Sequence, residues 1–428
     1  MSPSQPSFFE NAPGPESLHD PSEPFDEHLG AFQWEGKPTA VLETTVEVDG
    51  RPLTVPTFVN EFWTSRQRAA HSLHEVSYRG CFKPQLPRFF VERLTRADDV
   101  VYDPFMGRGT TLLEAALLGR VPVGCDVNPL SQVLVEPRLR PPSLDAVRER
   151  LSGVDWRTNG EHPEELLTFY HPDTLREICA LKTYLLRAPE AGPLDPVDAW
   201  IRMVAVNRLT GHSPGFFSVY TLPPNQAVSV AAQRKINADR SQVPPRRDVR
   251  RLILRKSNSL LSDCDPATGR ILEKLADRYR LLTGPAAGTP AIASSSVDLV
   301  VTSPPFLDVV NYAGDNWLRC WFCGIDPADV RLTVPRKIED WREAMTAVFS
   351  ELTRILKPGG HVAFEVGEVR GGRVRLEEHV IPCGVHAGLD ARLLLINAQA
   401  FTKTAACWGV DNNKKGTNTN RVVLFRKS

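Results

Sequence analysis

Two short motifs, almost two hundred positions apart, hold the residues of this chain that could do chemistry. The first is DPFMGRGTT at residues 103–111, and the second is TSPPF at residues 302–306. Each follows a short apolar run that predicts a buried strand. Loops at the carboxyl ends of parallel strands form the ligand-binding edge of open α/β sheets. The two motifs therefore predict one site, with a nucleotide-like cofactor at the first loop and an amino group at the second.

The first motif has the features of a cofactor-binding loop. Gly107 and Gly109 allow a sharp turn and a close approach of the backbone to a ligand. Residues 112–118 predict a helix whose free N–H groups face that ligand. The next predicted strand delivers Asp126, and an acid at this position commonly accepts hydrogen bonds from ribose hydroxyls. The string is neither the dinucleotide pattern G-x-G-x-x-G nor a P-loop.

The second motif suits the methylation of an exocyclic amine. Its two prolines fix two φ angles and remove two N–H donors, which predicts a stiff loop with carbonyls free to accept hydrogen bonds. Ser303 adds a hydroxyl acceptor, and Phe306 adds a flat face for a base that has left the helix. Acceptors aimed at the N–H bonds of the amine favour a tetrahedral nitrogen whose lone pair can attack a methyl group.

Together the motifs resemble those of the S-adenosylmethionine-dependent amino-methyltransferases of DNA. The Ser-Pro-Pro-Phe loop is similar to that of the cytosine-N4 enzymes, whereas adenine-N6 enzymes typically carry Asp/Asn-Pro-Pro-Tyr. The motif order resembles the α-class arrangement, over about residues 70–130 and 290–426. The resemblance implies an α/β, Rossmann-like class I methyltransferase fold with a mixed seven-stranded sheet. It also implies sequence-specific, direct in-line methylation of cytosine N4 in duplex DNA after base flipping.

The resemblance also assigns roles to individual residues. Ser303 and the Pro304 carbonyl would hold the amine within the catalytic loop Ser303, Pro304, Pro305 and Phe306. No acid or amide before the catalytic strand stands out as the contact for the cofactor's adenine. The implied contacts to S-adenosylmethionine come from the first motif, the acid after it and the segment before it: Tyr78, Asp103, Pro104, Phe105, Gly107, Gly109, Thr110, Thr111, Asp126 and Asn128.

The 428 residues divide into four parts by composition and motif position. Residues 1–36, rich in Pro, Ser and acids, predict a flexible arm. Residues 37–135 predict a hairpin that turns at Asp49-Gly50, helices that cover the cofactor, and the first half of the methyltransferase domain. Residues 136–290 predict an inserted, mainly helical target-recognition region, and residues 291–428 the catalytic half.

Within the predicted insertion, residues 234–256 are strongly basic, although the formal net charge of the chain is zero. For most charge runs a solvated helical face is the better interpretation. Here the run lies between the two motifs, where DNA methyltransferases can carry a recognition domain, and this favours DNA binding. The candidates for phosphate contacts are Arg234, Lys235, Arg246, Arg247, Arg250 and Arg251, and those for reading base edges are Asn225 and Gln226.

Composition bounds the setting of the protein. A hydrophobic content of 42% suffices for a sizeable core, and no apolar run is long enough to span a membrane. Eight cysteines without a disulfide-like pattern, and no signal peptide, predict a cytoplasmic, nucleoid-associated protein. No metal is expected, because Cys320 and Cys323 form a C-x-x-C without a second pair. Double-stranded DNA is the expected partner of a monomer or homodimer, and a cognate restriction endonuclease is a further candidate.

Three other functions compete with this interpretation. Cysteine-based C5 methylation is disfavoured because Cys383 follows a later strand without a supporting motif, so a buried thiol is the better reading. An adenine-N6 DNA methyltransferase or an RNA amino-methyltransferase would share the fold and the chemistry. A catalytically silent DNA-binding protein on the same scaffold would not need the intact Asp103, Asp126 and Ser303.

Overall fold

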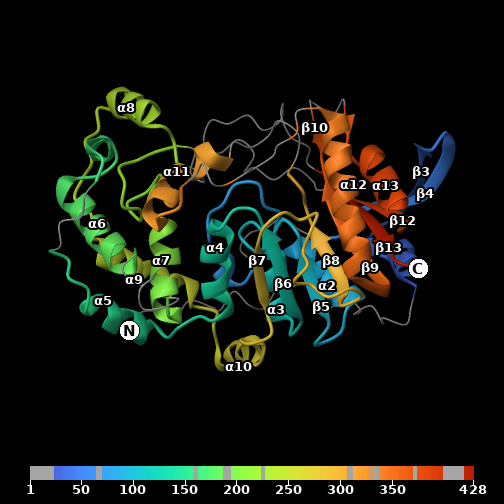
Figure 1. Cartoon of the computed structure of the whole chain (residues 1–428), viewed down its shortest axis with the longest axis horizontal. Helices are drawn as coiled ribbons and strands as arrows, with labels where there is room; N and C mark the ends of the chain where they lie inside the picture. The colour runs from blue at the N-terminus through green and yellow to red at the C-terminus, as the bar shows by residue number, and fades with distance from the viewer. Residues whose placement is uncertain are drawn as a thin grey trace.

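The structure, a computed structural model, describes residues 24–63, 70–157, 162–186, 194–222, 227–305, 312–326, 330, 335, 337–369, 374–398 and 419–428. Its centre is one sheet of nine strands. Helices cover both faces of the sheet, and a further group of helices lies beyond one of its edges (Figure 1).

The order of the strands defines the fold. From one edge to the other they are β7 (Arg280–Thr283), β6 (Val121–Asp126), β5 (Val100–Asp103), β8 (Val297–Thr302), β9 (Leu356–Val366), β13 (Thr419–Arg426), β12 (Asp390–Ala398), β4 (Arg51–Asn60) and β3 (Ala40–Val48). The first five are parallel, whereas β13 runs antiparallel to both β9 and β12. Strands β7 to β12 in this order make a Rossmann-like methyltransferase fold, so the predicted fold class is confirmed.

A β-hairpin extends the sheet from the predicted seven strands to nine. β3 pairs antiparallel with β4, and β4 lies parallel to β12. Asp49 and Gly50 turn the chain with φ angles of 51° and 72°. Two consecutive positive φ angles are what a two-residue hairpin loop needs. The predicted hairpin and its turn are confirmed.

Alternating side chains bury both faces of the central strands. Tyr102 and Val300 pack on one face with α12 (Ile338–Ile355) and α13 (Glu377–His386). Val101 and Val301 pack on the other face with α2 (Gln85–Leu94), next to α3 (Thr110–Leu117). Successive residues of a strand point to opposite faces, and a parallel sheet covered on both sides needs apolar residues at each. A separate two-stranded sheet pairs β10 (Glu368–Val369) with β11 (Val374–Arg375).

The described part of the predicted flexible arm, residues 24–36, forms regular structure, and residues 1–23 lie outside the described residues. α1 (Phe25–Ala31) is a helix, and β1 (Gln33–Trp34) pairs with β2 (Lys37–Pro38). Leu29 is fully buried, and the ring of Phe25 lies 6.2 Å from that of Phe89 on α2. The prediction weighed the Pro, Ser and acid content of this segment and overlooked apolar residues at helical spacing.

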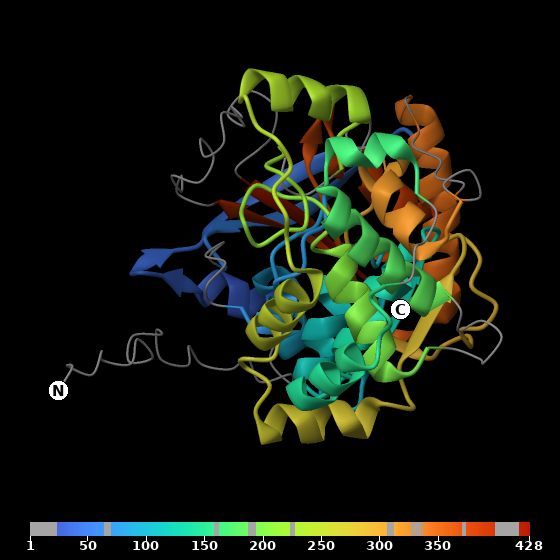
Figure 2. The same cartoon turned by 90° about the vertical axis from the view of Figure 1, so that its left-hand side faces the viewer.

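The helical region lies beyond β7, on the left of Figure 1 and facing the viewer in Figure 2. No helix in the described part of the chain is long and apolar enough to cross a bilayer. The helices on this side are α4 (Leu130–Leu139), α5 (Leu144–Ser152), α6 (Pro172–Leu186), α7 (Pro196–Val206), α8 (Val230–Asp239), α9 (Val249–Leu260), α10 (Pro266–Leu275) and α11 (Tyr312–Cys323), with the short η2 (Ser72–His74) and η3 (Glu164–Thr168).

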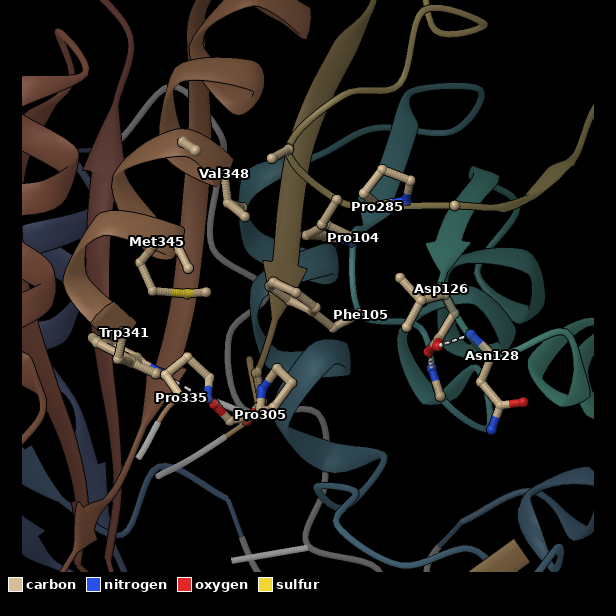
Figure 3. A pocket seen from close by; sticks show the side chains of 18 of the residues that line it. Pro104, Phe105, Asp126, Asn128, Pro285, Pro305, Pro335, Trp341, Met345 and Val348 are labelled. Carbon is tan, nitrogen blue, oxygen red and sulfur yellow. Dashed lines mark hydrogen bonds between the residues drawn. The ribbon is translucent and has the colours of Figure 1, made fainter. Parts of the chain in front are cut away.

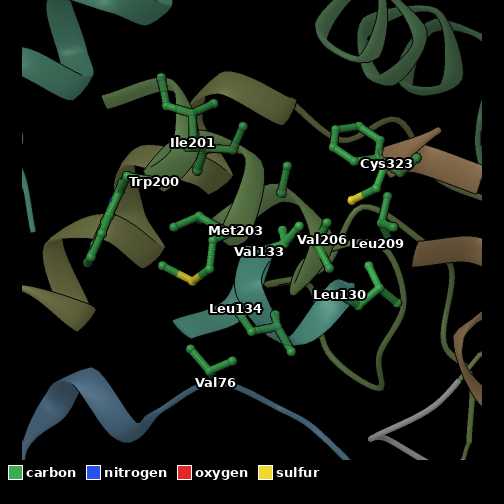
Figure 4. Packing of buried hydrophobic residues seen from close by; sticks show 14 of the residues in the cluster. Val76, Leu130, Val133, Leu134, Trp200, Ile201, Met203, Val206, Leu209 and Cys323 are labelled. Atoms are coloured by element: carbon green, nitrogen blue, oxygen red, sulfur yellow. The ribbon is translucent and has the colours of Figure 1, made fainter. Parts of the chain in front are cut away.

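One hydrophobic core joins this region to the sheet domain. Met203 and Val206 of α7 belong to the same buried cluster as Leu130 and Leu134 of α4, which follows β6 (Figure 4). Strand β7 lies within residues 136–290, the predicted insertion, and yet pairs with β6 in the central sheet. The helical part of that range therefore ends before β7.

A glycine pair offers a test of how tightly the first loop is packed. Both Gly109 and Gly119 have left-handed backbones, with φ of 72° and 74°. A Cβ at Gly109 would lie 2.4 Å from Val135, whereas one at Gly119 would meet nothing within 4 Å. We expect Gly119→Ala to cost about 1–2 kcal/mol for the backbone alone, and Gly109→Ala about 1–3 kcal/mol more for overpacking. Equal losses in urea denaturation would contradict this packing role.

Candidate active site

The first motif forms a loop that is fastened to the end of β6. Gly107 has a φ of 47°, and its N–H donates to the Asp126 carboxylate at 2.8 Å. The Met106 N–H donates to the Cys125 carbonyl at 3.0 Å. A Cβ at Gly107 would lie 3.6 Å from the Tyr78 ring, so the glycine brings the loop close to the segment above it.

A cavity of about 390 Å³ opens at the carboxyl ends of β5, β6, β7 and β8. This is the edge where the strand order reverses, because β5 has β6 on one side and β8 on the other. Ligands of open α/β sheets bind at such switch points. Both motifs line the cavity, with Phe105 and Gly107 from the first and Ser303 and Pro305 from the second. The predicted meeting of the two motifs is therefore confirmed.

Asp126 presents a carboxylate to one end of the cavity (Figure 3). Its oxygens accept hydrogen bonds from the N–H groups of Gly107 and Asn128, at 2.8 and 2.9 Å. Burial raises the pKa of this carboxyl, while the two N–H donors favour its ionised form. Each carboxylate oxygen has a second lone pair, so the group can still accept bonds from a diol.

The other walls of the cavity are apolar. Phe105 and Pro285 face it from the ends of β5 and β7, and α12 contributes Trp341, Met345 and Val348 (Figure 3). Sequence analysis missed these α12 residues, because their i, i+4, i+7 spacing indicates only a helix with a buried face. A diol acceptor beside flat apolar walls fits a nucleoside.

The segment after β7, where the sequence showed no acid or amide for an adenine contact, also lines the cavity. Residues 284–287 line the cavity, and the Gly284 N–H donates to the Asp126 carbonyl at 3.0 Å. None of these residues has a polar side chain. A ring bound here would meet backbone groups and carbon, which explains why no acid or amide marked the position.

Hydrogen bonds connect the two motifs directly. The Thr302 hydroxyl donates to the Asp103 carboxylate at 2.6 Å, and the Thr111 hydroxyl donates to the Val301 carbonyl at 3.0 Å. The Trp341 indole N–H donates to the Pro305 carbonyl at 3.1 Å. Because Trp341 is fully buried, this hydrogen bond holds the Pro305 carbonyl in a fixed position.

Ser303 has a buried acidic partner that sequence analysis missed. Its hydroxyl lies beside the carboxylate of Glu365, near the end of β9, and helps to stabilise the ionised form of that group. The Asn420 amide donates to Glu365 at 3.1 Å. Glu365 is 7% exposed, and burial raises the pKa of its carboxyl. The signal in the sequence was one acid inside the apolar run of residues 361–366.

The predicted cofactor residues separate into two groups. Tyr78, Pro104, Phe105, Gly107, Asp126 and Asn128 line the cavity. Asp103, Gly109, Thr110 and Thr111 are buried beneath the loop and are not among the described residues that line it. The Asp103 carboxylate and the Thr111 hydroxyl join the loop to β8, while Gly109 makes room for Val135. Phe306 lies outside the described residues.

The structure does not bring the basic stretch to the cavity. Arg234 and Lys235 are exposed on α8. Arg246 and Arg247 lie just before α9, and Arg250 and Arg251 lie in its first turn. Arg246 approaches Asp173 and Glu177 of α6, at 3.9 and 3.8 Å. Asn225 and Gln226 lie outside the described residues. Among the described residues, no group of three His, Cys, Asp or Glu side chains is placed to hold a metal ion.

Comparison with known proteins agrees with this geometry. Residues 42–132 match the family model of the N6/N4 methyltransferases, described as DNA methylases. This segment of the chain is therefore similar to the DNA methylases. The matched residues include the hairpin, the segment before the first motif, the whole motif and Asp126.

Curated relatives match parts of the chain. The type II methyltransferase M.MjaII of Methanocaldococcus jannaschii is 33% identical over 86 residues, 20% of this chain and 16% of that protein. M.BsoBI of Geobacillus stearothermophilus is 22% identical over 312 residues, 64% of this chain and 57% of that protein. A tRNA (guanine(10)-N2)-dimethyltransferase of M. jannaschii is 36% identical over 63 residues, 14% of this chain and 18% of that protein. The chain thus covers 57% or less of each of these three proteins.

Solved structures give a weaker likeness. The crystal structure of TrmN from Thermus thermophilus matches 82% of this chain and 50% of that chain, with 14% identity and a TM-score of 0.31. The fold therefore rests on the strand order of the chain itself. N6/N4 methylases use S-adenosylmethionine, and the Asp126 carboxylate beside apolar walls fits the nucleoside part of that cofactor.

The ionisation of Asp103 should affect stability. Burial raises the pKa of this carboxyl from 3.8 to about 7, although hydrogen bonds from Thr302 and the Phe105 N–H oppose the shift. Between pH 4 and 7 the folded Asp103 keeps a proton that the unfolded one has lost, so its contribution to stability falls as the pH rises. We expect Asp103→Asn, which cannot ionise, to become more stable than the wild type as the pH rises through this window. The difference between the two unfolding free energies should grow by about 1.4 kcal/mol per pH unit and stay constant above pH 7.

The measurement is urea denaturation of both proteins at several pH values between 4 and 8. Other titrating groups contribute equally to both, so the difference between the two unfolding free energies isolates Asp103. A difference that stays constant with pH would show that Asp103 does not titrate in this window.

Proposed function

We propose that this protein methylates the exocyclic N4 amine of cytosine in duplex DNA, with S-adenosylmethionine as the methyl donor. The observation that carries the proposal is the Ser303–Glu365 pair at the edge of the cofactor cavity. A serine that donates its proton to a buried carboxylate keeps its lone pairs for another donor. The exocyclic amine of a base is such a donor.

The second motif would position the base for the reaction. Ser303 and the Pro304 carbonyl accept the two N–H bonds of the amine, and Phe306 stacks on the ring after the base has left the helix. Trp341 holds Pro305 in place, which keeps these acceptors fixed before the substrate arrives. S-adenosylmethionine supplies an electrophilic methyl group that the amine lone pair can attack in line.

Glu365 would receive the proton that the amine must lose. The nitrogen gains a carbon and must release one hydrogen to become neutral again. Ser303 passes its hydroxyl proton to Glu365 and takes the proton from the nitrogen. The raised pKa of Glu365 suits this role, because a carboxylate with a raised pKa is a stronger base.

The helical region would hold the DNA. Arg234, Lys235 and the arginines 246, 247, 250 and 251 are proposed phosphate contacts, and Asn225 and Gln226 are proposed to read base edges. A role in restriction-modification, with a cognate endonuclease, or in solitary DNA methylation follows from this substrate. The protein would then act at the nucleoid, as a monomer or homodimer.

A single product analysis tests the substrate and the atom. We would incubate the protein with labelled S-adenosylmethionine and either duplex DNA or RNA, digest to nucleosides, and identify the methylated one by mass spectrometry. The expected product is N4-methylcytosine from DNA. N6-methyladenine would show that Ser303 does not specify cytosine. A methylated ribonucleoside would favour the RNA alternative, to which the partial match with a tRNA methyltransferase lends some support.

Substitutions of Ser303 and Glu365 test the proposed proton path. We expect Ser303→Ala and Glu365→Gln each to lower turnover by about 10²-fold or more, with cofactor affinity within about twofold of the wild type. The double variant should lose little more than either single one, because the two residues act as a unit. Ser350→Ala, an exposed serine of α12, is the matched control. If the losses of the two single variants add in the double variant, or if turnover and cofactor affinity fall equally, the proposed proton path is wrong.

A further inference from the structure

A second cavity, of about 570 Å³, lies beside the first and shares Tyr78 and Gly80 with it. Its walls come from three places: the segment over residues 70–84, Arg108 of the glycine loop, and two residues of the helical region, Arg208 and Lys256. It therefore lies where the cofactor-covering segment, the first motif and the helical region meet. The function proposed above leaves this cavity without a role.

Positive charge dominates the second cavity. Its basic residues are Arg79, Lys83, Arg108, Arg208 and Lys256, and its only described acid is Glu75. Glu75 is 2.9 Å from Lys256, and Arg79 pairs with Asp315, also at 2.9 Å. The remaining three basic side chains form no ion pair with a carboxylate among the described residues.

Two of the three remaining cations, Arg108 and Arg208, are held in place without being neutralised. Arg108 is 8% exposed and donates to the carbonyls of His74 and Val76, at 3.3 and 2.8 Å. Arg208 donates to the Asn207 carbonyl and lies 4.1 Å over the Phe216 ring. Carbonyls and rings orient a guanidinium but leave its charge uncompensated. Concentrated, half-buried charge of one sign is costly, and binding an anion relieves that cost.

The protonation equilibria agree with this reading. Burial, and then the neighbouring Arg108, lower the pKa of Lys83. Burial, and then Arg255, lower the pKa of Arg208 to about 10. An oxyanion bound in the cavity would favour the charged form of both side chains.

We propose that this cavity binds a backbone phosphate of the nucleic acid, next to the base that enters the first cavity. The inference rests on the proposed function, since it assumes a nucleic-acid substrate. The other source of an oxyanion is the carboxylate of the cofactor. Phosphate is favoured because the cations come from both the catalytic domain and the helical region, so a ligand here bridges the two parts. The contact would anchor the strand and carry no sequence information.

The test removes charge from the cavity and from a distant surface. Lys83→Gln/Arg208→Gln is compared with Arg270→Gln/Lys274→Gln, two exposed cations of α10, which lies at the opposite edge of the strands in Figure 1. Binding to a 30-base-pair duplex of random sequence is followed by fluorescence anisotropy over a range of salt concentrations. Cofactor affinity and thermal melting are measured on the same samples.

We expect the cavity variant to bind duplex about tenfold more weakly, with the salt slope reduced by about one for each phosphate that the protein no longer neutralises. The control variant should stay within about twofold of the wild type, and cofactor affinity should not change. If Arg208→Gln unfolds the protein, Lys83→Gln alone replaces it. The Lys83 ammonium makes no hydrogen bond or ion pair among the described residues, so its removal spares the packing.

Three outcomes would overturn the inference. The first is a cavity variant that binds duplex as tightly as the control variant, and the second is a salt slope equal to that of the wild type. The third is a loss of cofactor affinity alone, which would assign the cavity to the carboxylate of the cofactor. Failure of the proposed function is distinguishable, because it appears in the product analysis of the wild type. If the wild type methylates RNA, the same variants measured on that RNA decide the role of the cavity.

Discussion

The parallel pairing of β5 with β8 is the constraint on which the active site depends. It places Tyr102 beside Val300, and so delivers two loops from distant parts of the chain to the same edge of the sheet. The Thr302–Asp103 hydrogen bond then fixes the spacing between them. The chain between the two strands includes helices α3 to α10, and it leaves the sheet and returns to it on either side of this contact.

The chemistry of the site draws on charge that the fold buries at a cost. The carboxyls of Asp103, Asp126 and Glu365 all have raised pKa values, with burial as the largest cause in each. No cation pairs with Asp103 or Glu365 among the described residues. Their partners are hydroxyls, an amide and backbone N–H groups, which orient a carboxylate while leaving it basic. Burying these carboxyls lowers the stability of the fold, and it leaves them able to accept hydrogen bonds and protons.

The sequence predicted much of this arrangement because its signals are local. The glycine loop, Asp126 and the hairpin turn are each specified by a few adjacent residues. Glu365 and Trp341 could not be predicted in the same way, since their roles come from packing against residues far away in sequence. Asp103 and Thr111 were assigned to the cofactor, although they join the loop to β8, because a motif does not show which of its residues face inward. The α1 helix was not predicted, because the segment was judged by its Pro, Ser and acid content and not by the helical spacing of its apolar residues.

The continuous core between α7 and α4 has a consequence for how such a protein could change its specificity. Removing α7 would uncover Leu130 and Leu134 of α4, and the separated helix would expose Trp200, Ile201 and Met203. The helical region is therefore not an independent cassette that could be exchanged between relatives. Substitutions on its outer surface can accumulate one side chain at a time, whereas its buried face must stay as it is.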